Sequence, residues 1–147
     1  MYQNTSTTEY KHKIFIQRVV EFEVVWGLES EEGWATSSSN EDDHTSVIIF
    51  WSDRAYANAL VKKDWSKYKP SQMPLAEFFE NWLVGMHNDN ILVGTNWDAN
   101  MFGKESHPLE LALEIIDELK LKGKQLKLTQ YEGIEDFESK IRSALEE

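Results

Sequence analysis

Apolar residues recur with a helical period at the start of the chain and with a shorter period just after it. From Ser6, which has Glu9 three positions on in the spacing of a capping box, apolar side chains fall on one side of a helix that should run to about Glu21. Three short apolar or β-branched stretches follow, at residues 23–28, 33–37 and 47–51. These stretches predict a three-stranded antiparallel meander whose last connection is a long polar loop.

The second half of the chain is mainly helical in its pattern. Ser52 is placed as the N-cap of a helix to about Lys63, and the two prolines of segment 64–74 predict a linker that ends regular structure there. Residues 75–86 carry the clearest amphipathic pattern of the chain. The remaining predicted elements are a strand at 91–97, a helix from Pro108 to about Leu121, a strand at 125–131 and a final helix from Ile134.

The predicted order of elements, α-βββ-α-α-β-α-β-α, is that of an α+β protein. We expect a mixed or mainly antiparallel sheet of about five strands, packed by helices. A chain of 147 residues has the size of one ordinary domain, and 41% of its residues are hydrophobic. A single domain over residues 1–147 follows.

Charge and cysteine content narrow the classes of function. With 26 acidic residues against 15 basic ones, the formal net charge is −11. This charge repels phosphate backbones and anionic membranes, so we expect no nucleic acid and no membrane partner, whereas a basic protein partner would suit it. The chain has no cysteine, which rules out disulfides, thiolate chemistry and Cys-ligated metals. The N-terminal residues lack the apolar stretch of a secretory signal, and no apolar run approaches the ~20 residues of a membrane span, so we expect a cytoplasmic protein.

Several phrases of the sequence occur together in one order. They are VWGLESEEGWA, FWSDRAYA, the Trp65–Tyr68–Pro70 spacing, PLAEFFENWLVGM and ILVGTNWDA. In this order they resemble the bacterial domain-of-unknown-function family 2750, over roughly residues 15–121. The resemblance implies a small cytoplasmic α+β protein and brings no established reaction, cofactor or catalytic residue. Residues 122–147 form an extension outside it. The first phrase also resembles small immunity-protein domains of bacterial toxin systems.

The cluster Ser52-Asp53-Arg54 has the residue types of a small catalytic site. A nucleophilic serine needs a base within hydrogen-bond reach, and no histidine or G-x-S-x-G turn lies nearby in the sequence. We therefore interpret Ser52 as a helix cap and place Asp53 in the first turn, where the helix dipole favours a carboxylate. Arg54 opposes that dipole, so it should either pair with a carboxylate or bind an anion. No catalytic residue is predicted.

Tryptophans and strand ends supply the candidate binding residues. Trp26, Trp34 and Trp51 fall on adjacent predicted strands and would form either an aromatic core layer or the wall of a groove. Trp97 lies at the end of a predicted strand beside Asp98, with Asn96 nearby. Because binding sites are common where strands pass into loops, this is the preferred edge of a pocket.

The sequence predicts no metal and no cofactor. The acidic loop 41–44 lacks the spacing of a calcium site, and the oxygen-bearing residues Asn96, Asp98 and Asn100 lack its glycine and its closing glutamate. The four histidines have no metal-ligand spacing, and His12 is placed on a polar helix face. No phosphate-binding or dinucleotide-binding glycine motif occurs.

Three hypotheses of function follow from these features. The first is an acidic protein-binding module, of which an immunity-like inhibitor is one version. In this module the acidic loops 29–32 and 40–43 attract a basic partner. The alternative is a small-molecule binding protein or an unrecognised enzyme with a strand-end pocket. That pocket would use Trp51, Arg54, Trp97 and Asp98. The third is self-association through an exposed apolar surface, and the oligomeric state is left open.

Overall fold

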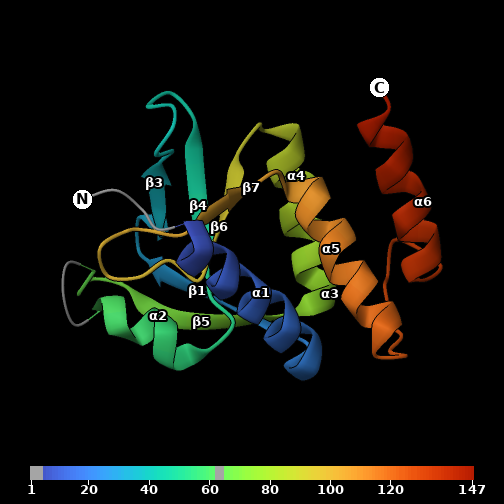
Figure 1. The fold of residues 1–147 in the computed structure, drawn as a ribbon, viewed down its shortest axis with the longest axis horizontal. Helices are drawn as coiled ribbons and strands as arrows, with labels where there is room; N and C mark the ends of the chain where they lie inside the picture. The colour runs from blue at the N-terminus through green and yellow to red at the C-terminus, as the bar shows by residue number, and fades with distance from the viewer. Residues whose placement is uncertain (1–4, 62–64) are drawn as a thin grey trace.

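In the computed structural model, the described residues, 5–61 and 65–147, form seven strands and five helices (Figure 1). The helices are α1 (Thr5–Phe22), α2 (Arg54–Val61), a continuous helix made of α3 (Leu75–Glu77), η1 (Phe78–Leu83) and α4 (Val84–Asn88), α5 (Pro108–Leu121) and α6 (Ile134–Leu145). The strands are β1 (Val24–Ser30), β2 (Gly33–Trp34), β3 (Thr36–Ser38), β4 (Ser46–Phe50), β5 (Lys69–Pro74), β6 (Leu92–Thr95) and β7 (Lys104–Ser106). The α+β class is confirmed.

The strands divide between two sheets, in place of the single sheet of about five strands that the pattern predicted. The first has the order β2-β1-β5 and the second the order β3-β4-β6-β7, and only the β4–β6 pair is parallel among the described strands. The predicted meander is present, but its middle strand is divided at Ala35. The Ala35 N–H donates to Leu28 in the first sheet (2.9 Å), and its carbonyl accepts from Ile49 in the second (3.2 Å). The same stretch of chain therefore serves both sheets.

A second junction joins the sheets at Trp26 and Trp51. Their backbones exchange two hydrogen bonds of 2.8 and 2.7 Å, an antiparallel bridge between the middle of β1 and the residue after β4. The backbone beside Trp26 packs closely on the Trp34 ring because residue 27 is glycine. A Cβ at Gly27 would lie 2.7 Å from that ring.

Three segments differ from the sequence-based prediction. The expected linker 64–74 contains β5, which pairs with β1 from Val24↔Pro74 to Glu29↔Lys69. Prolines are tolerated because β5 is an edge strand and needs ladder hydrogen bonds on one side only. The expected strand at 125–131 is absent, and this segment is irregular. A short strand, β7, lies in the predicted loop before Pro108.

The predicted helices are all present, with small shifts at their ends. Helix α1 begins before the proposed cap Ser6, and α5 has the predicted bounds. The predicted helix 75–86 extends to Asn88 and has a π-helical middle. The predicted end of the second helix, Lys63, lies outside the described residues.

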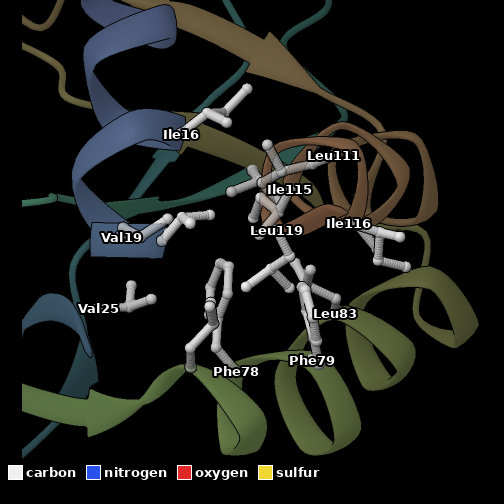
Figure 2. Close-up of a cluster of buried hydrophobic side chains, with 14 of the residues drawn as sticks. Ile16, Val19, Val25, Phe78, Phe79, Leu83, Leu111, Ile115, Ile116 and Leu119 are labelled. Carbon is white, nitrogen blue, oxygen red and sulfur yellow. The ribbon is translucent and has the colours of Figure 1, made fainter. Parts of the chain in front are cut away.

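The main hydrophobic core lies among α1, the 75–88 helix and α5 (Figure 2). Phe78 and Phe79 project from the π-helical turn towards Val19 of α1 and Leu119 of α5. Helix α6 lies beside α5 at one end of the molecule (Figure 1) and adds Phe137, whose ring centroid is 5.1 Å from that of Phe79. The predicted C-terminal extension thus completes the same core.

A buried carboxylate explains why segment 125–131 is not a strand. Glu80, on the π-helical turn and 6% exposed, accepts hydrogen bonds from the backbone N–H groups of Thr129 (3.0 Å) and Gln130 (2.5 Å). Leu126 is buried in the main core. The alternating pattern therefore reflects a loop fixed to a helix, in which a carboxylate takes the place of a neighbouring strand.

A smaller core lies between the sheets and α2. Its buried members are Leu28, Ala35, Val47, Ile49, Trp51, Ala57, Leu60 and Trp97. None of the helices in the described residues is both long and apolar enough to cross a bilayer.

Candidate functional site

The parallel pairing of β4 and β6 brings together two segments that the sequence analysis singled out. The carboxyl ends of parallel strands meet at one edge of a sheet, and Phe50 at the end of β4 is opposite Thr95 at the end of β6. The loop after β4 begins Trp51-Ser52-Asp53, and the loop after β6 begins Asn96-Trp97-Asp98. Helix α1 contacts β6 and β7 at this edge.

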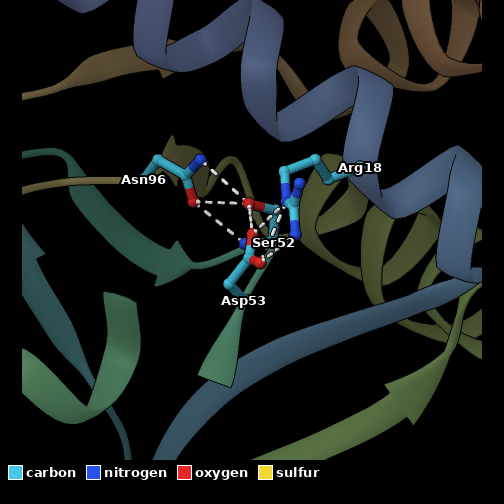
Figure 3. A network of polar contacts seen from close by, with 4 residues as sticks. All are labelled: Arg18, Ser52, Asp53 and Asn96. Atoms are coloured by element: carbon cyan, nitrogen blue, oxygen red, sulfur yellow. Dashed lines mark hydrogen bonds and ion pairs between the residues drawn. The ribbon is translucent and has the colours of Figure 1, made fainter. Parts of the chain in front are cut away.

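A hydrogen-bond network joins the two loops to α1 (Figure 3). Arg18 binds the Asp53 carboxylate through two nitrogens, with Nε 2.7 Å from Oδ1 and Nη2 2.6 Å from Oδ2. Ser52 Oγ donates to Asp53 Oδ1 (2.6 Å), and the Ser52 N–H donates to Asn96 Oδ1 (2.9 Å). Asn96 Nδ2 donates to Ser52 Oγ (3.1 Å) and to the Lys11 carbonyl (3.3 Å). Every group in this network is used internally.

Asn96 combines a side-chain role with an unusual backbone conformation. Its φ of 50° lies in the left-handed region, where asparagine is among the better tolerated residues apart from glycine. The residue is 6% exposed, and Ser52 beside it is 3% exposed. Both are positions where the loop backbone needs a hydrogen-bond partner that water cannot supply.

The charge state of Asp53 is fixed by its neighbours. Partial burial raises the pKa of this carboxyl, but hydrogen bonds from Arg18 and Ser52 outweigh that effect and hold the pKa below its ordinary value. The pKa of Arg18 is raised, chiefly by its hydrogen bond to Asp53. The carboxylate therefore stays ionised and paired at neutral pH.

The structure changes the roles predicted for Ser52-Asp53-Arg54. The first helical hydrogen bonds of α2 end at the Asp53 carbonyl, which accepts from Tyr56 and Ala57, so Asp53 and not Ser52 occupies the N-cap position. The salt bridge of this cluster is made by Asp53 with Arg18. Arg54 is exposed and makes no ion pair with another described residue, so the carboxylate partner expected for it is not found there.

A pocket of about 280 Å³ opens beside the network. It lies between α1, α2 and the loop after β6, and its lining residues are Tyr10, Lys11, Ile14, Tyr56, Ala59, Leu60, Asn96, Trp97, Asp98 and Ala99. The walls are mainly apolar, and two tyrosines on them are exposed, Tyr10 at 65% and Tyr56 at 46%. Its volume is near the lower end of the roughly 300–1,000 Å³ usual for ligand sites.

One ion pair supplies charge to this pocket. Lys11 Nζ lies 3.2 Å from Asp98 Oδ2 and also donates to the Phe102 carbonyl (2.9 Å). Asp98 Oδ1 accepts from the backbone N–H groups of Asn100 (2.9 Å) and Phe102 (3.2 Å), which closes the loop after β6. The side chains of Lys11 and Asp98 are 21% and 44% exposed, so both are accessible from solvent.

The predicted tryptophans separate into core and pocket positions. Trp51 is fully buried and its indole N–H donates to the Trp97 carbonyl (2.9 Å), while Trp34 packs edge to face on Trp82 in the main core. Trp26 packs against the smaller core. Trp97 lines the pocket, and its own N–H donates to the Lys104 carbonyl (3.0 Å). Of the predicted site residues, the pocket therefore brings together Asn96, Trp97 and Asp98.

Sequence reasoning missed the pocket residues that belong to helices. Tyr10 and Lys11 lie on α1, and Tyr56 and Leu60 lie on α2. The one local signal for these pocket residues is a tyrosine that lies outside the apolar face of a predicted helix. Such a tyrosine does not indicate which other element of the fold it faces.

The histidine assigned to a polar helix face is buried instead. His12 is 3% exposed, with Nδ1 2.8 Å from Thr95 Oγ1 and Nε2 3.1 Å from Glu114 Oε1. It joins α1 to β6 and α5 through polar contacts that the hydrophobic pattern does not reveal.

In the acidic loop 40–43, one carboxylate binds neighbouring groups of the same connection. Asp42 accepts from the His44 N–H (2.9 Å) and the Thr45 hydroxyl (2.8 Å), and these hydrogen bonds lower its pKa. Across residues 5–61 and 65–147, no three His, Cys, Asp or Glu side chains are grouped in a way that could hold a metal ion.

This chain belongs to the DUF2750 family, described as proteins of unknown function, whose pattern matches residues 12–115. The family resemblance of the sequence phrases is thereby confirmed. The match contains most of the pocket and the four side chains of the network, but not Tyr10 or Lys11, and it ends within α5. Comparison with curated proteins and with solved structures gives no match.

Proposed function

We propose that this protein binds a small organic molecule in the pocket formed by α1, α2 and the loop after β6. The observation that carries the proposal is the pocket itself: a hollow of about 280 Å³ with apolar walls, exposed tyrosines and one accessible ion pair. Ligand sites are typically concave and mainly apolar, with a few polar groups that orient the ligand. Their usual place in a sheet with parallel strands is outside the carboxyl ends, which is where this pocket lies.

The paired loops give the pocket a rigid base. Asn96 and Ser52 use their polar groups on each other and on Lys11, so the backbone under the pocket is held before any ligand arrives. A site that is already formed loses less entropy when it binds. The small volume favours a ligand of one or two rings.

The alternative of a basic protein partner has weaker support. The acidic loops 29–32 and 40–43 lie at opposite ends of the 33–38 segment, so they do not form one acidic surface. The open hollow beside the first loop is lined by Glu29, Glu31 and Glu32 but also by Lys67 and Lys69. Mixed charge of this kind gives little attraction for a strongly basic surface.

The proposal is tested by filling the pocket. Ala59 lines it and is exposed on α2, so Ala59→Trp should occupy the space without disturbing the core. Ala55, exposed one turn earlier on the same helix and outside the lining, gives the matched control Ala55→Trp. A fragment library would be screened by protein-observed NMR, followed by thermal unfolding with each hit.

We expect hits that shift the amide resonances of the loop after β6 and raise the unfolding temperature of the native protein and of Ala55→Trp, with no effect on Ala59→Trp. Arg54→Ala should bind as the native protein does, because Arg54 lies outside the lining. Hits that bind Ala59→Trp equally well would contradict the proposal.

A further inference from the structure

The hydrogen-bonding capacity left at the Lys11–Asp98 pair identifies the chemistry of the ligand, provided that the pocket is a ligand site as proposed above. Among the described residues, the Lys11 ammonium donates to Asp98 and to the Phe102 carbonyl, which uses two of its three hydrogens. Asp98 Oδ1 accepts two backbone N–H groups, whereas Oδ2 accepts only from Lys11 within residues 5–61 and 65–147. One donor and one acceptor therefore remain, on atoms 3.2 Å apart.

We propose that the pocket binds a neutral, planar cyclic amide, meaning a lactam or imide whose N–H and C=O lie side by side on a ring. The ligand carbonyl accepts from Lys11 Nζ, and the ligand N–H donates to Asp98 Oδ2. Both charged groups keep their own contact while each gains one further hydrogen bond. Hydrogen bonds to ionised groups are the stronger kind, so this edge of the ligand fixes its orientation.

The remaining walls suit a flat ring. Tyr10 and Tyr56 are the exposed aromatic residues of the pocket, and Ile14 and Leu60 provide apolar surface. Aromatic rings pack on planar ligands by offset or edge-to-face contact. The volume of about 280 Å³ accommodates one or two fused rings.

Charged ligands match this site less well. A lone anion that approaches Lys11 also meets the Asp98 carboxylate, and a lone cation meets the Lys11 ammonium at the same distance. A zwitterionic amino acid would balance the charges, but it brings three N–H donors and about four lone-pair sites to a place that offers one of each. Its remaining polar groups would lose water against apolar walls without new partners.

The test uses a matched series of probes. It consists of 2-quinolinone as the cyclic amide, N-methyl-2-quinolinone without the donor, quinoline without the carbonyl, 1-naphthoate, 1-naphthylmethylamine and phenylalanine. Dissociation constants would be measured by NMR titration on the native protein. We expect 2-quinolinone to bind at least about tenfold more tightly than its N-methyl analogue, because the analogue has no N–H to donate to Asp98 Oδ2 and places a methyl group there.

Asp98→Asn provides a second readout. Asparagine keeps the Oδ1 acceptor that closes the loop but replaces Oδ2 with a donor, so the preference for the N–H probe over the N-methyl probe should disappear. Lys11→Met should weaken both 2-quinolinone and its N-methyl analogue, because the carbonyl of each loses its donor. Thermal unfolding of both variants checks that they fold.

The outcomes separate this inference from the proposed function. Equal binding of the N-methyl probe to the native protein, or tighter binding of the acid, the amine or phenylalanine, would overturn the ligand class while leaving a ligand site. Failure of all the aromatic probes to shift pocket resonances would contradict the proposed function as well.

Discussion

Removing the Asp53 carboxylate should destabilise the fold measurably, because Arg18 binds it through two nitrogens at 2.6 and 2.7 Å. A hydrogen bond to a charged group contributes about 1.5–3 kcal/mol, but the Arg18 side chain is 37% exposed and solvent screens part of the interaction. We therefore expect Asp53→Asn to lower the free energy of unfolding by about 2 kcal/mol. For a chain of this size that corresponds to a fall of roughly 4–8 °C in Tm.

The assay is a double-mutant cycle with Arg18→Met, followed by urea unfolding and tryptophan fluorescence at pH 7. The coupling energy of the pair should be about 1–2 kcal/mol. The control is Asp136→Asn, which breaks a solvent-exposed pair with Lys140 (2.8 Å) and should destabilise the fold much less than Asp53→Asn does.

The stabilisation contributed by the Asp53 carboxylate should decrease as the pH is lowered. The folded state lowers the pKa of Asp53, so the unfolded chain takes up a proton first as the pH falls, and the stabilisation by the carboxylate is lost through the folded pKa. The difference between the native protein and Asp53→Asn should stay constant from pH 7 to about 5 and shrink below about pH 4. A coupling energy near zero at pH 7, or a difference that grows on acidification, would refute this reasoning.

Two further predictions concern packing and the C-terminal segment. Gly103→Ala would place a Cβ 2.1 Å from the Trp97 ring and should lower the free energy of unfolding, measured in urea, by about 1–3 kcal/mol. The control Gly85→Ala lies in a helix with nothing within 4 Å of its Cβ, so it should be neutral or stabilising by up to about 1 kcal/mol. Equal effects of the two substitutions would show that Trp97 is not confined. Glu80→Ala should speed hydrogen exchange at the amides of Thr129 and Gln130 and destabilise the fold by about 1–3 kcal/mol. Unchanged protection of both amides would contradict the role of Glu80 in holding the segment 125–131.

Local signals explain where the sequence predicted the structure well. Helix α5 has the predicted bounds because Pro108 begins it and an apolar stripe continues to its end. The 75–88 helix was predicted from its apolar spacing alone, although that spacing did not indicate the π-helical turn at Phe78–Leu83. In each case the information lies within the segment itself.

Strand predictions failed where the partner decides the structure. The segment with Pro70 and Pro74 looks like a linker, yet it pairs along the whole of β1 because an edge position tolerates both prolines. The alternating segment 125–131 looks like a strand, yet the backbone N–H groups of Thr129 and Gln130 donate to the carboxylate of Glu80. Neither partner can be identified from the segment alone.

The pocket residues were likewise predicted only where the signal lies within one segment. Asn96, Trp97 and Asp98 were predicted because they lie where a predicted strand ends, and that position is typical of binding sites. Tyr10 and Tyr56 come from the surfaces of two helices that meet only in the folded chain. The parallel pairing of β4 with β6 was also not predicted, and it is what brings both loops to one edge.

The network and the pocket share Asn96 and Lys11, so groups that support the fold also form part of the pocket wall. Asn96 uses both amide hydrogens and its carbonyl on Ser52 and on the Lys11 backbone, so it has no hydrogen left to donate to a ligand. Asn96 holds the backbone of Lys11, and the Lys11 ammonium lies 3.2 Å from Asp98 in the pocket. Asp53 holds the other side of Ser52 and ties it to α1 through Arg18. The Ser-Asp pair that has the residue types of a catalytic cluster therefore supports the loop beside the pocket and ties it to α1.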